Sequence, residues 1–220
     1  MPAEVFSYTG NDVVTRVRSQ FGDYSGAQLN NEQILAWIND GQREIVNSNS
    51  ILRATKISDL VAGQQDYTFP EDKVFAIEAV YVSGYPIQNI SPQAAREYII
   101  ALDPAKQLNA ERPEVWYERA GIITFYPVPS KSITGAIKLE YVKTPTPLVT
   151  ISSPVSVPDR YFNELVAYVT SQALEMDENY SAAAYKIGQF REGLDRLNLK
   201  ENLSQTDLYQ QLLPDPDDFL

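Results

Sequence analysis

The chain contains no cysteine and no histidine among its 220 residues. Without cysteine it can form neither a disulfide framework nor a thiolate metal site. Without histidine it lacks the commonest metal ligand, the usual general base of enzymes and the side chain that titrates near neutral pH. We therefore expect no catalytic residues, no metal ligands and no cofactor.

Basic residues are also scarce. The 18 lysines and arginines stand against 29 aspartates and glutamates, which gives a formal net charge of −11. A protein that binds DNA through its phosphates needs a basic stripe, and none is evident. An acidic surface repels DNA instead. We expect any DNA that passes near this protein to do so without being held.

Long apolar runs are absent as well. No run approaches the length of a bilayer span, and the first residues, MPAEVFSYTG, have neither the basic region nor the apolar region of a signal peptide. The sequence predicts no membrane contact and assembly in the cytoplasm.

Apolar residues recur at helical spacing in two N-terminal segments, 10–21 and 30–48. Asn30 can cap the second segment, with Gln33 in the position that completes a capping box. Gly41 would let a neighbouring helix approach closely. Both segments are predicted to be helices.

Helical spacing returns near the other end of the chain, over residues 157–176 and 180–199. Pro158 suits the first turn of the first of these helices. The short break at residues 177–180, DENY, is typical of the turn between two antiparallel helices.

Between these helical regions the period changes to two, which is typical of strands. A Gly-containing turn at residues 120–121 joins two alternating segments and predicts a hairpin. One short helix, with Ser91 as its cap, interrupts the strands. The predicted strands cover residues 73–83, 115–119, 122–129 and 135–145. The predicted short helix covers residues 91–102.

The order of these elements predicts an α+β fold. N- and C-terminal helices form an antiparallel bundle, an antiparallel β unit is inserted between them, and an extended C-terminal tail follows. The predicted divisions are 1–50 for the N-terminal helices, 51–154 for the β unit with its short helix, 155–202 for the C-terminal helical hairpin, and 203–220 for the tail.

The last 18 residues, LSQTDLYQQLLPDPDDFL, contain four aspartates and no lysine or arginine. The first half of this segment can form a helical turn, and Pro214 and Pro216 force the backbone after it to be extended. Such a segment suits a basic, groove-bearing partner and orders on binding; a frayed terminus is the alternative. The residues expected to bind are Leu208, Tyr209, Leu212, Leu213, Asp215, Asp217, Asp218, Phe219 and Leu220.

No catalytic motif is present. The chain has no phosphate-binding loop, no dinucleotide-binding glycine pattern and no nucleophile elbow. The aspartates near the end of the chain lack the spacing and the glycine of a calcium loop. A small carboxylate-dependent hydrolase is the enzymatic alternative, but no pair of carboxylates stands out for it.

Several stretches together resemble the head-to-tail adaptor proteins of tailed bacteriophages, over roughly residues 10–200. The three that carry the resemblance best are GQQDYTFP at 63–70, GIITFYPVP at 121–129 and PDRYFNELV at 158–166. Their order and spacing are more specific than any one of them.

The resemblance implies a structural role in the virion. Such adaptors are helical bundles with a β insertion, form a twelve-fold ring under the portal and line the channel for DNA. Their C-terminal segment reaches the portal, so the tail described above becomes the expected portal-binding segment. The implied partners are the portal protein, a tail or nozzle protein and further copies of the chain, in a neck assembled in the host cytoplasm.

A cyclic ring needs two different faces of each subunit, and the bundle helices are the candidates for these faces. The expected interface residues are Trp37, Arg43, Tyr161, Tyr168, Tyr185 and Arg191. Two alternatives stay open: a stopper or tail-side neck protein of the virion, and a small interaction module unrelated to phages.

Overall fold

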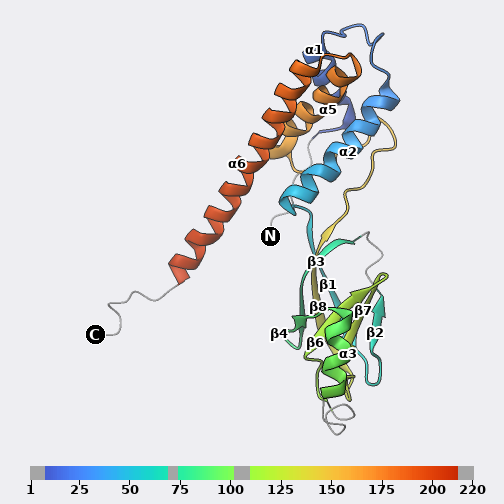
Figure 1. Ribbon diagram of the computed structural model, residues 1–220, viewed down its shortest axis with the longest axis vertical. Coiled ribbons are helices and arrows are strands. Elements are labelled where there is room, and N and C mark those ends of the chain that lie inside the picture. Colours follow the sequence, from blue (N-terminus) through green and yellow to red (C-terminus); the bar gives the residue numbers. More distant parts are fainter. Residues whose placement is uncertain (1–7, 69–73, 102–109, 213–220) are drawn as a thin grey trace, which may run out of the picture. The chain divides into compact units, whose positions relative to one another are not determined.

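The computed structural model describes residues 8–68, 74–101 and 110–212, with the side chains of Ile99 and of residues 200–212 left out. The chain divides into two compact units (Figure 1). The helical unit comprises Met1–Ile51 and Pro145–Leu220, and the β unit comprises Leu52–Thr144. The mixed α+β class predicted from the sequence is confirmed, with helical segments on both sides of the β segment in the chain.

In the helical unit, one helix is surrounded by the others. Helix α5 (Phe162–Met176) contacts α1 (Gly10–Phe21), α2 (Asn31–Asn49) and α6 (Tyr180–Leu212). Its buried residues occupy more than one side of the helix, as a central position requires. They are Glu164, Leu165, Val166, Ala167, Val169, Thr170, Ser171 and Ala173.

The expected N-cap of α2 is confirmed, with a different partner. Asn30 Oδ1 accepts a hydrogen bond from the backbone N–H of Glu32 at 3.0 Å, so the cap does not depend on Gln33. A reciprocal capping box occurs instead at α1, where the backbone N–H of Thr9 donates to Asp12 Oδ2 at 2.7 Å. Short polar side chains thus begin both N-terminal helices.

The loop between α1 and α2 is organised by one carboxylate. Asp23, which is 3% exposed, accepts backbone N–H groups from Ala27 at 2.9 Å, Gln28 at 3.2 Å and Leu29 at 2.9 Å. The bond from Leu29 is the largest cause that lowers the pKa of Asp23, and the bonds from Gln28 and Ala27 add to it against the opposing effect of burial. Arg18 Nη2 closes the loop by donating to the carbonyl of Leu29 at 2.9 Å.

The β unit contains two four-stranded sheets. One has the order β1 (Arg53–Leu60), β8 (Ile133–Lys143), β3 (Val74–Val82), β4 (Tyr85–Pro86), and all its pairs are antiparallel. The other has the order β2 (Asp66–Thr68), β7 (Ile122–Tyr126), β6 (Val115–Arg119), β5 (Gln88–Asn89). Residues of both sheets, among them Leu139 and Phe125, form one hydrophobic core.

Two features of the β unit test the predictions directly. The expected hairpin is confirmed: β6 and β7 pair antiparallel, and Ala120 and Gly121 both have positive φ, at 51° and 78°, as a two-residue hairpin turn requires. The expectation of a purely antiparallel unit is wrong at one edge, because β5 pairs with β6 in parallel. Helix α3 (Pro92–Ala101) lies between these two strands in the chain, and such a crossover makes a parallel pair possible.

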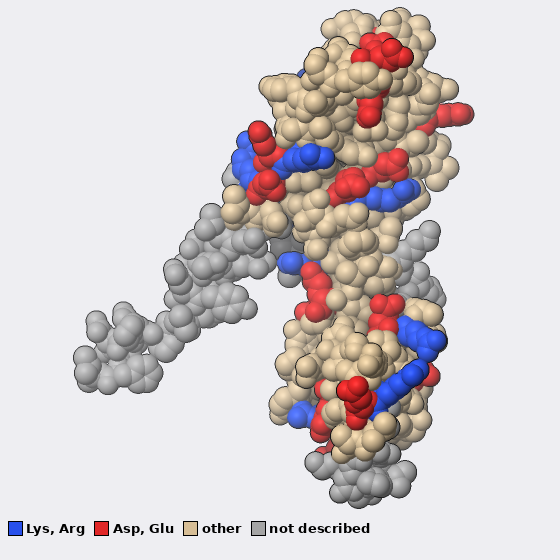
Figure 2. Space-filling view, in the orientation of Figure 1, with Lys and Arg blue, Asp and Glu red and all other residues tan. Residues whose placement is uncertain are grey.

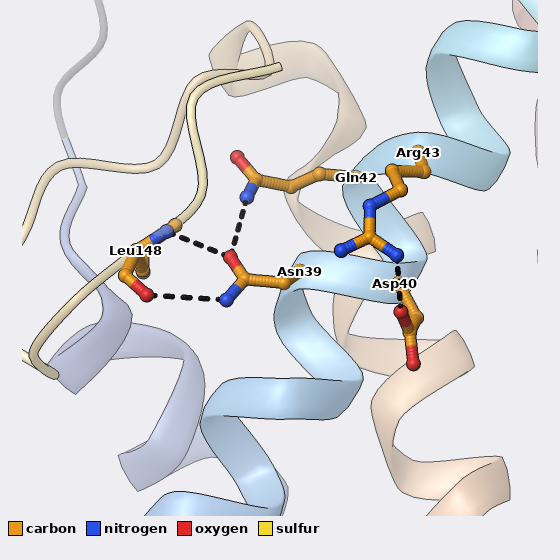
Figure 3. A network of polar contacts seen from close by, with 5 residues as sticks. All are labelled: Asn39, Asp40, Gln42, Arg43 and Leu148. Carbon is orange, nitrogen blue, oxygen red and sulfur yellow. Dashed lines mark hydrogen bonds and ion pairs between the residues drawn. The ribbon is translucent and has the colours of Figure 1, made fainter. Parts of the chain in front are cut away.

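The boundary after the β unit differs from the predicted residue 154, since Pro145 already belongs to the helical unit. The reason is an amide network on α2 (Figure 3). Asn39 Oδ1 accepts the backbone N–H of Leu148 at 2.7 Å, and Asn39 Nδ2 donates to the carbonyl of Leu148 at 3.1 Å. Gln42 Oε1 accepts the N–H of Ser156 at 2.6 Å. These bonds hold the segment after β8 against the bundle.

The last helix also ends later than predicted. Helix α6 continues to Leu212, past the expected boundary at residue 202, so residues 203–212 extend this helix. No proline or glycine lies between Gly193 and Pro214, and nothing in the backbone interrupts the helix before that proline. Residues 213–220 lie outside the described residues.

The Asn39 network leads to a stability prediction. Replacing Asn39 by Ala leaves the N–H and the carbonyl of the buried Leu148 without the partners that Asn39 supplies. We expect Asn39→Ala to lower the free energy of unfolding by about 1–3 kcal/mol, measured by urea denaturation. The adjacent Asp40→Ala is the control, because it removes only an exposed ion pair with Arg43 and should cost about 0–1 kcal/mol. Equal losses would contradict this role of Asn39.

The Asp23 loop predicts a pH dependence. Because the pKa of Asp23 is lowered in the folded state, its ionised form stabilises the fold above the unfolded pKa of about 3.9, and this contribution is lost as the pH falls through the folded pKa. Between about pH 7 and pH 2, the Tm of the wild type should therefore fall further than that of Asp23→Asn, by circular dichroism. A difference in Tm that stays constant over this range would show that the charge of Asp23 is not involved.

Candidate functional site

The six residues expected at a subunit interface all lie in the helical unit, but they differ in exposure. Trp37 and Tyr168 are half-buried, whereas Arg43, Tyr185 and Arg191 are exposed. Tyr161 is 0% exposed, so its side chain is not available to another subunit. The prediction is wrong for Tyr161.

The burial of Tyr161 follows from the way α5 begins. Residues Asp159–Tyr161 form a 3₁₀ turn instead of the first turn of the α-helix. This turn directs Tyr161 into the bundle, where its hydroxyl oxygen accepts from Asn49 Nδ2 at 3.3 Å. The following Phe162 packs at its edge against Tyr8, with ring centroids 4.6 Å apart. A regular helical period does not predict this change of phase.

Tyr168 is largely used inside the chain. Its ring lies over Gly41 of α2, where an added Cβ would be 2.8 Å from Tyr168 Cδ1, and it contacts Phe190 of α6 with centroids 5.2 Å apart. Burial is the largest cause that raises the pKa of Tyr168, followed by the charges of Asp40, Glu44 and Glu175. The role predicted for Gly41, close approach of a neighbouring helix, is confirmed.

Two exposed candidates lie on α6. Tyr185 is 66% exposed, and its hydroxyl accepts from Gln189 Nε2 at 3.1 Å. Arg191 is exposed, and no hydrogen bond or ion pair joins it to the other described residues. On α2, Arg43 Nη1 pairs with Asp40 Oδ1 at 2.9 Å (Figure 3). These side chains remain accessible for an interface.

The residues expected to bind a portal fall into two groups. Leu208, Tyr209 and Leu212 belong to α6, whose backbone is described there. The others lie outside the described residues: Leu213, Asp215, Asp217, Asp218, Phe219 and Leu220.

The negative charge is divided unequally between the two units. The helical unit contains eight lysines and arginines against eighteen aspartates and glutamates, a formal charge of −10. The β unit contains ten against eleven, a formal charge of −1. On the face drawn in Figure 2, basic and acidic side chains of the described residues are interspersed, without a continuous basic patch. Sequence reasoning used only the total charge and missed this division.

Sequence reasoning also missed a buried carboxylate. Glu164 of α5 is 6% exposed and lies in a cavity of about 350 Å³. The signal in the sequence was its spacing, three residues after Tyr161 and four before Tyr168, which places it near the inner side of the helix. The lining residues come from α1, α5 and α6 and are Gln20, Asn163, Glu164, Ala167, Lys186, Gln189 and Arg196.

The charge of Glu164 also acts on Tyr8. The pKa of Tyr8 is raised above its ordinary value, first by burial and then by the charges of Asp159 and Glu164. The Tyr8 hydroxyl donates to the carbonyl of Pro158 at 2.8 Å. A protonated Tyr8 thus joins the N-terminal segment to the start of α5.

Two searches of the described residues bear on other kinds of function. No group of three or more acidic side chains in them comes together in a way that could hold a metal ion. None of the helices they form combines the length and the apolar composition needed to cross a bilayer.

The SU10 adaptor protein family, a phage head-to-tail adaptor family, has a model that matches residues 8–212. The chain belongs to this family. A search of the curated proteins returned no match.

Family membership confirms the resemblance noted in the sequence. The chain is a phage adaptor protein and a structural component of the virion. The match extends over the bundle, the β unit and α6 as far as its last residue, Leu212.

The contact between Tyr168 and Gly41 gives a prediction with a matched control. In Gly41→Ala the new methyl group would meet Leu165 Cδ1 and Tyr168 Cδ1 at 2.8 Å each, which forces α2 and α5 apart. We expect a loss of about 1–3 kcal/mol in the free energy of unfolding. Gly188→Ala on α6 meets nothing within 4 Å and should stabilise by up to about 1 kcal/mol. Parallel denaturant titrations compare them, and a gain in both variants would contradict the tight contact.

Proposed function

We propose that this chain forms the ring that joins the portal to the tail of a bacteriophage and lines the channel for DNA. The observation that carries the proposal is the family match over residues 8–212, which includes both compact units. The ring has twelve copies, matches the portal in symmetry and contains no catalytic centre. Its partners are the portal on one side and a tail or nozzle protein on the other.

The division of charge supports a position of the helical unit next to DNA. A formal charge of −10 on this unit repeats around a ring and repels the phosphate backbone, so DNA passes without specific binding. The nearly neutral β unit has no such effect on DNA. This difference in charge supports a channel lined by the helical unit and contacts with proteins through the β unit.

The end of α6 and the residues after it form the portal-binding segment, residues 203–220. Helix α6 is buried against α5 as far as Leu194, and Leu199 is already 63% exposed. The final part of this segment is acidic, with three aspartates and no basic residue after Leu212. A basic groove on the portal provides the complementary surface.

The test is the mass of the complex formed with the portal of the same virion, measured by native mass spectrometry. The full-length chain should form a complex of one ring and one portal. A variant that ends at Asn202 should lose it, because it lacks the whole binding segment. A variant that ends at Leu212 is the matched control, since it keeps the complete α6 and lacks only residues 213–220.

Each result identifies a different part of the proposal. Loss in both truncated variants assigns binding to residues 213–220, and loss in the shorter variant alone assigns it to the end of α6. A complex that survives both truncations keeps the adaptor role and contradicts the binding segment. No complex with the full-length chain contradicts the adaptor role and favours the stopper or tail-side neck protein.

A further inference from the structure

Glu164 is a buried charged residue that lacks a full set of partners. Its Oε2 atom is buried and accepts no hydrogen bond from the described residues. Its Oε1 atom is 3.7 Å from Arg196 Nη2, and the Arg196 side chain is 70% exposed. A carboxylate out of contact with water needs donors to offset the free-energy cost of burial. One distant and exposed guanidinium does not supply them.

The neighbouring helix leaves room for this carboxylate. At Gly193 of α6 an added Cβ would be 2.7 Å from Glu164 Cγ and 2.7 Å from Glu164 Oε1. Any other residue at this position would push the carboxylate out of its place. Glycine in the interior of a helix makes the helix less stable than alanine would. At position 193, however, only glycine leaves enough space for the Glu164 carboxylate.

The other polar groups of the cavity do not complete the site. Lys186 Nζ donates to Gln20 Oε1 at 3.0 Å and is held on the side of α1. Gln189 lines the cavity and donates through Nε2 to the Tyr185 hydroxyl at 3.1 Å. Asn163 lines the cavity as well. Lys186 and Arg196 line the cavity, yet neither donates to Glu164 Oε2, and the cavity has space of about 350 Å³ beside this carboxylate.

A planar guanidinium fits the Glu164 carboxylate, because it can offer two parallel donors to the two carboxylate oxygens. The helical unit provides such a group on its own surface. Arg191 is exposed, and Gly193 faces Glu164. With 100° of rotation per residue, Arg191 lies roughly 180° around α6 from the mean direction of the cavity residues Lys186, Gln189, Gly193 and Arg196.

We propose that the cavity at Glu164 receives the Arg191 side chain of a second copy of this chain. The two faces of α6 then form the two halves of one heterologous contact, which is the kind of contact that closes a cyclic ring. The proposal rests on the ring of the proposed function. It assigns Glu164 as the acceptor and Arg191 as the donor of the contact between subunits.

The first test measures the protein concentration at which half of the full-length chain is in rings, by mass photometry in the presence of the portal. Glu164→Gln and Arg191→Gln should each raise this concentration at least tenfold, and the double variant should raise it no further. Glu175→Gln and Arg16→Gln are the charge-matched controls, because both residues are exposed on the same unit, and they should leave it unchanged. Additive effects of the two variants, or no effect, would overturn the proposal.

A second test uses the wild-type chain alone, so that it does not depend on the folding of a variant. Butylguanidinium imitates the end of an arginine side chain, and butylurea is its neutral counterpart. Butylguanidinium should shift the amide NMR signals of Gly193 and Ala167 saturably at millimolar concentration, and butylurea should not. Equal shifts with both probes, or none, would overturn the assignment of the cavity to a cation.

A third test identifies the source of the arginine. Because the chain has no cysteine, a bis-maleimide can link only cysteines that are introduced. Rings formed from a mixture of Asn163→Cys chains and mass-tagged Asp195→Cys chains, which keep Arg191 one turn from the introduced cysteine, should give a crosslinked pair of one chain of each kind. Rings that form without such a pair overturn the second copy as the occupant and leave the adaptor role intact. If the wild-type chain forms no ring, both the proposed function and the binding of Arg191 from a second copy are wrong. This conclusion does not depend on the result obtained with butylguanidinium and butylurea.

Discussion

The fold of the helical unit depends on the burial of α5. This helix contacts α1, α2 and α6, so each of them must present an apolar or small surface to it. Gly41 meets this demand on α2 and Gly193 meets it on α6, where larger residues would collide with Tyr168 and Glu164. The hydrophobic effect drives the burial of α5. Close packing limits the size of the residues that can lie next to it.

Polar side chains then connect distant parts of the chain to this bundle. Asn39 and Gln42 of α2 bind the backbone after β8, and Asn49 binds both Tyr161 and the carbonyl of Leu194. These amides satisfy backbone groups that would otherwise be buried without partners. They also explain why the chain can leave the bundle for the β unit and return to it at a defined residue.

The same burial creates the features that a ring can use. Most of helix α5 is covered by the bundle, and its buried carboxylate, Glu164, borders a cavity. Helix α6 has one face against α5, and the exposed Arg191 lies on the side away from the cavity residues. A subunit with a cavity on one side of a helix and accessible side chains on the other has the two unlike surfaces that cyclic assembly needs.

The sequence by itself determined the elements whose signals are local. The helices at 10–21 and 30–48, the cap at Asn30, the Ala120–Gly121 hairpin and the α+β class all follow from apolar period, capping and turn residues, which act over a few positions. The family resemblance followed from the order of such stretches. The tertiary structure alone decided the parallel pairing of β5 with β6, the boundary before Pro145, the burial of Tyr161 and the cavity around Glu164. These features depend on contacts between residues far apart in the chain. A local sequence pattern does not determine which distant segments pack against each other.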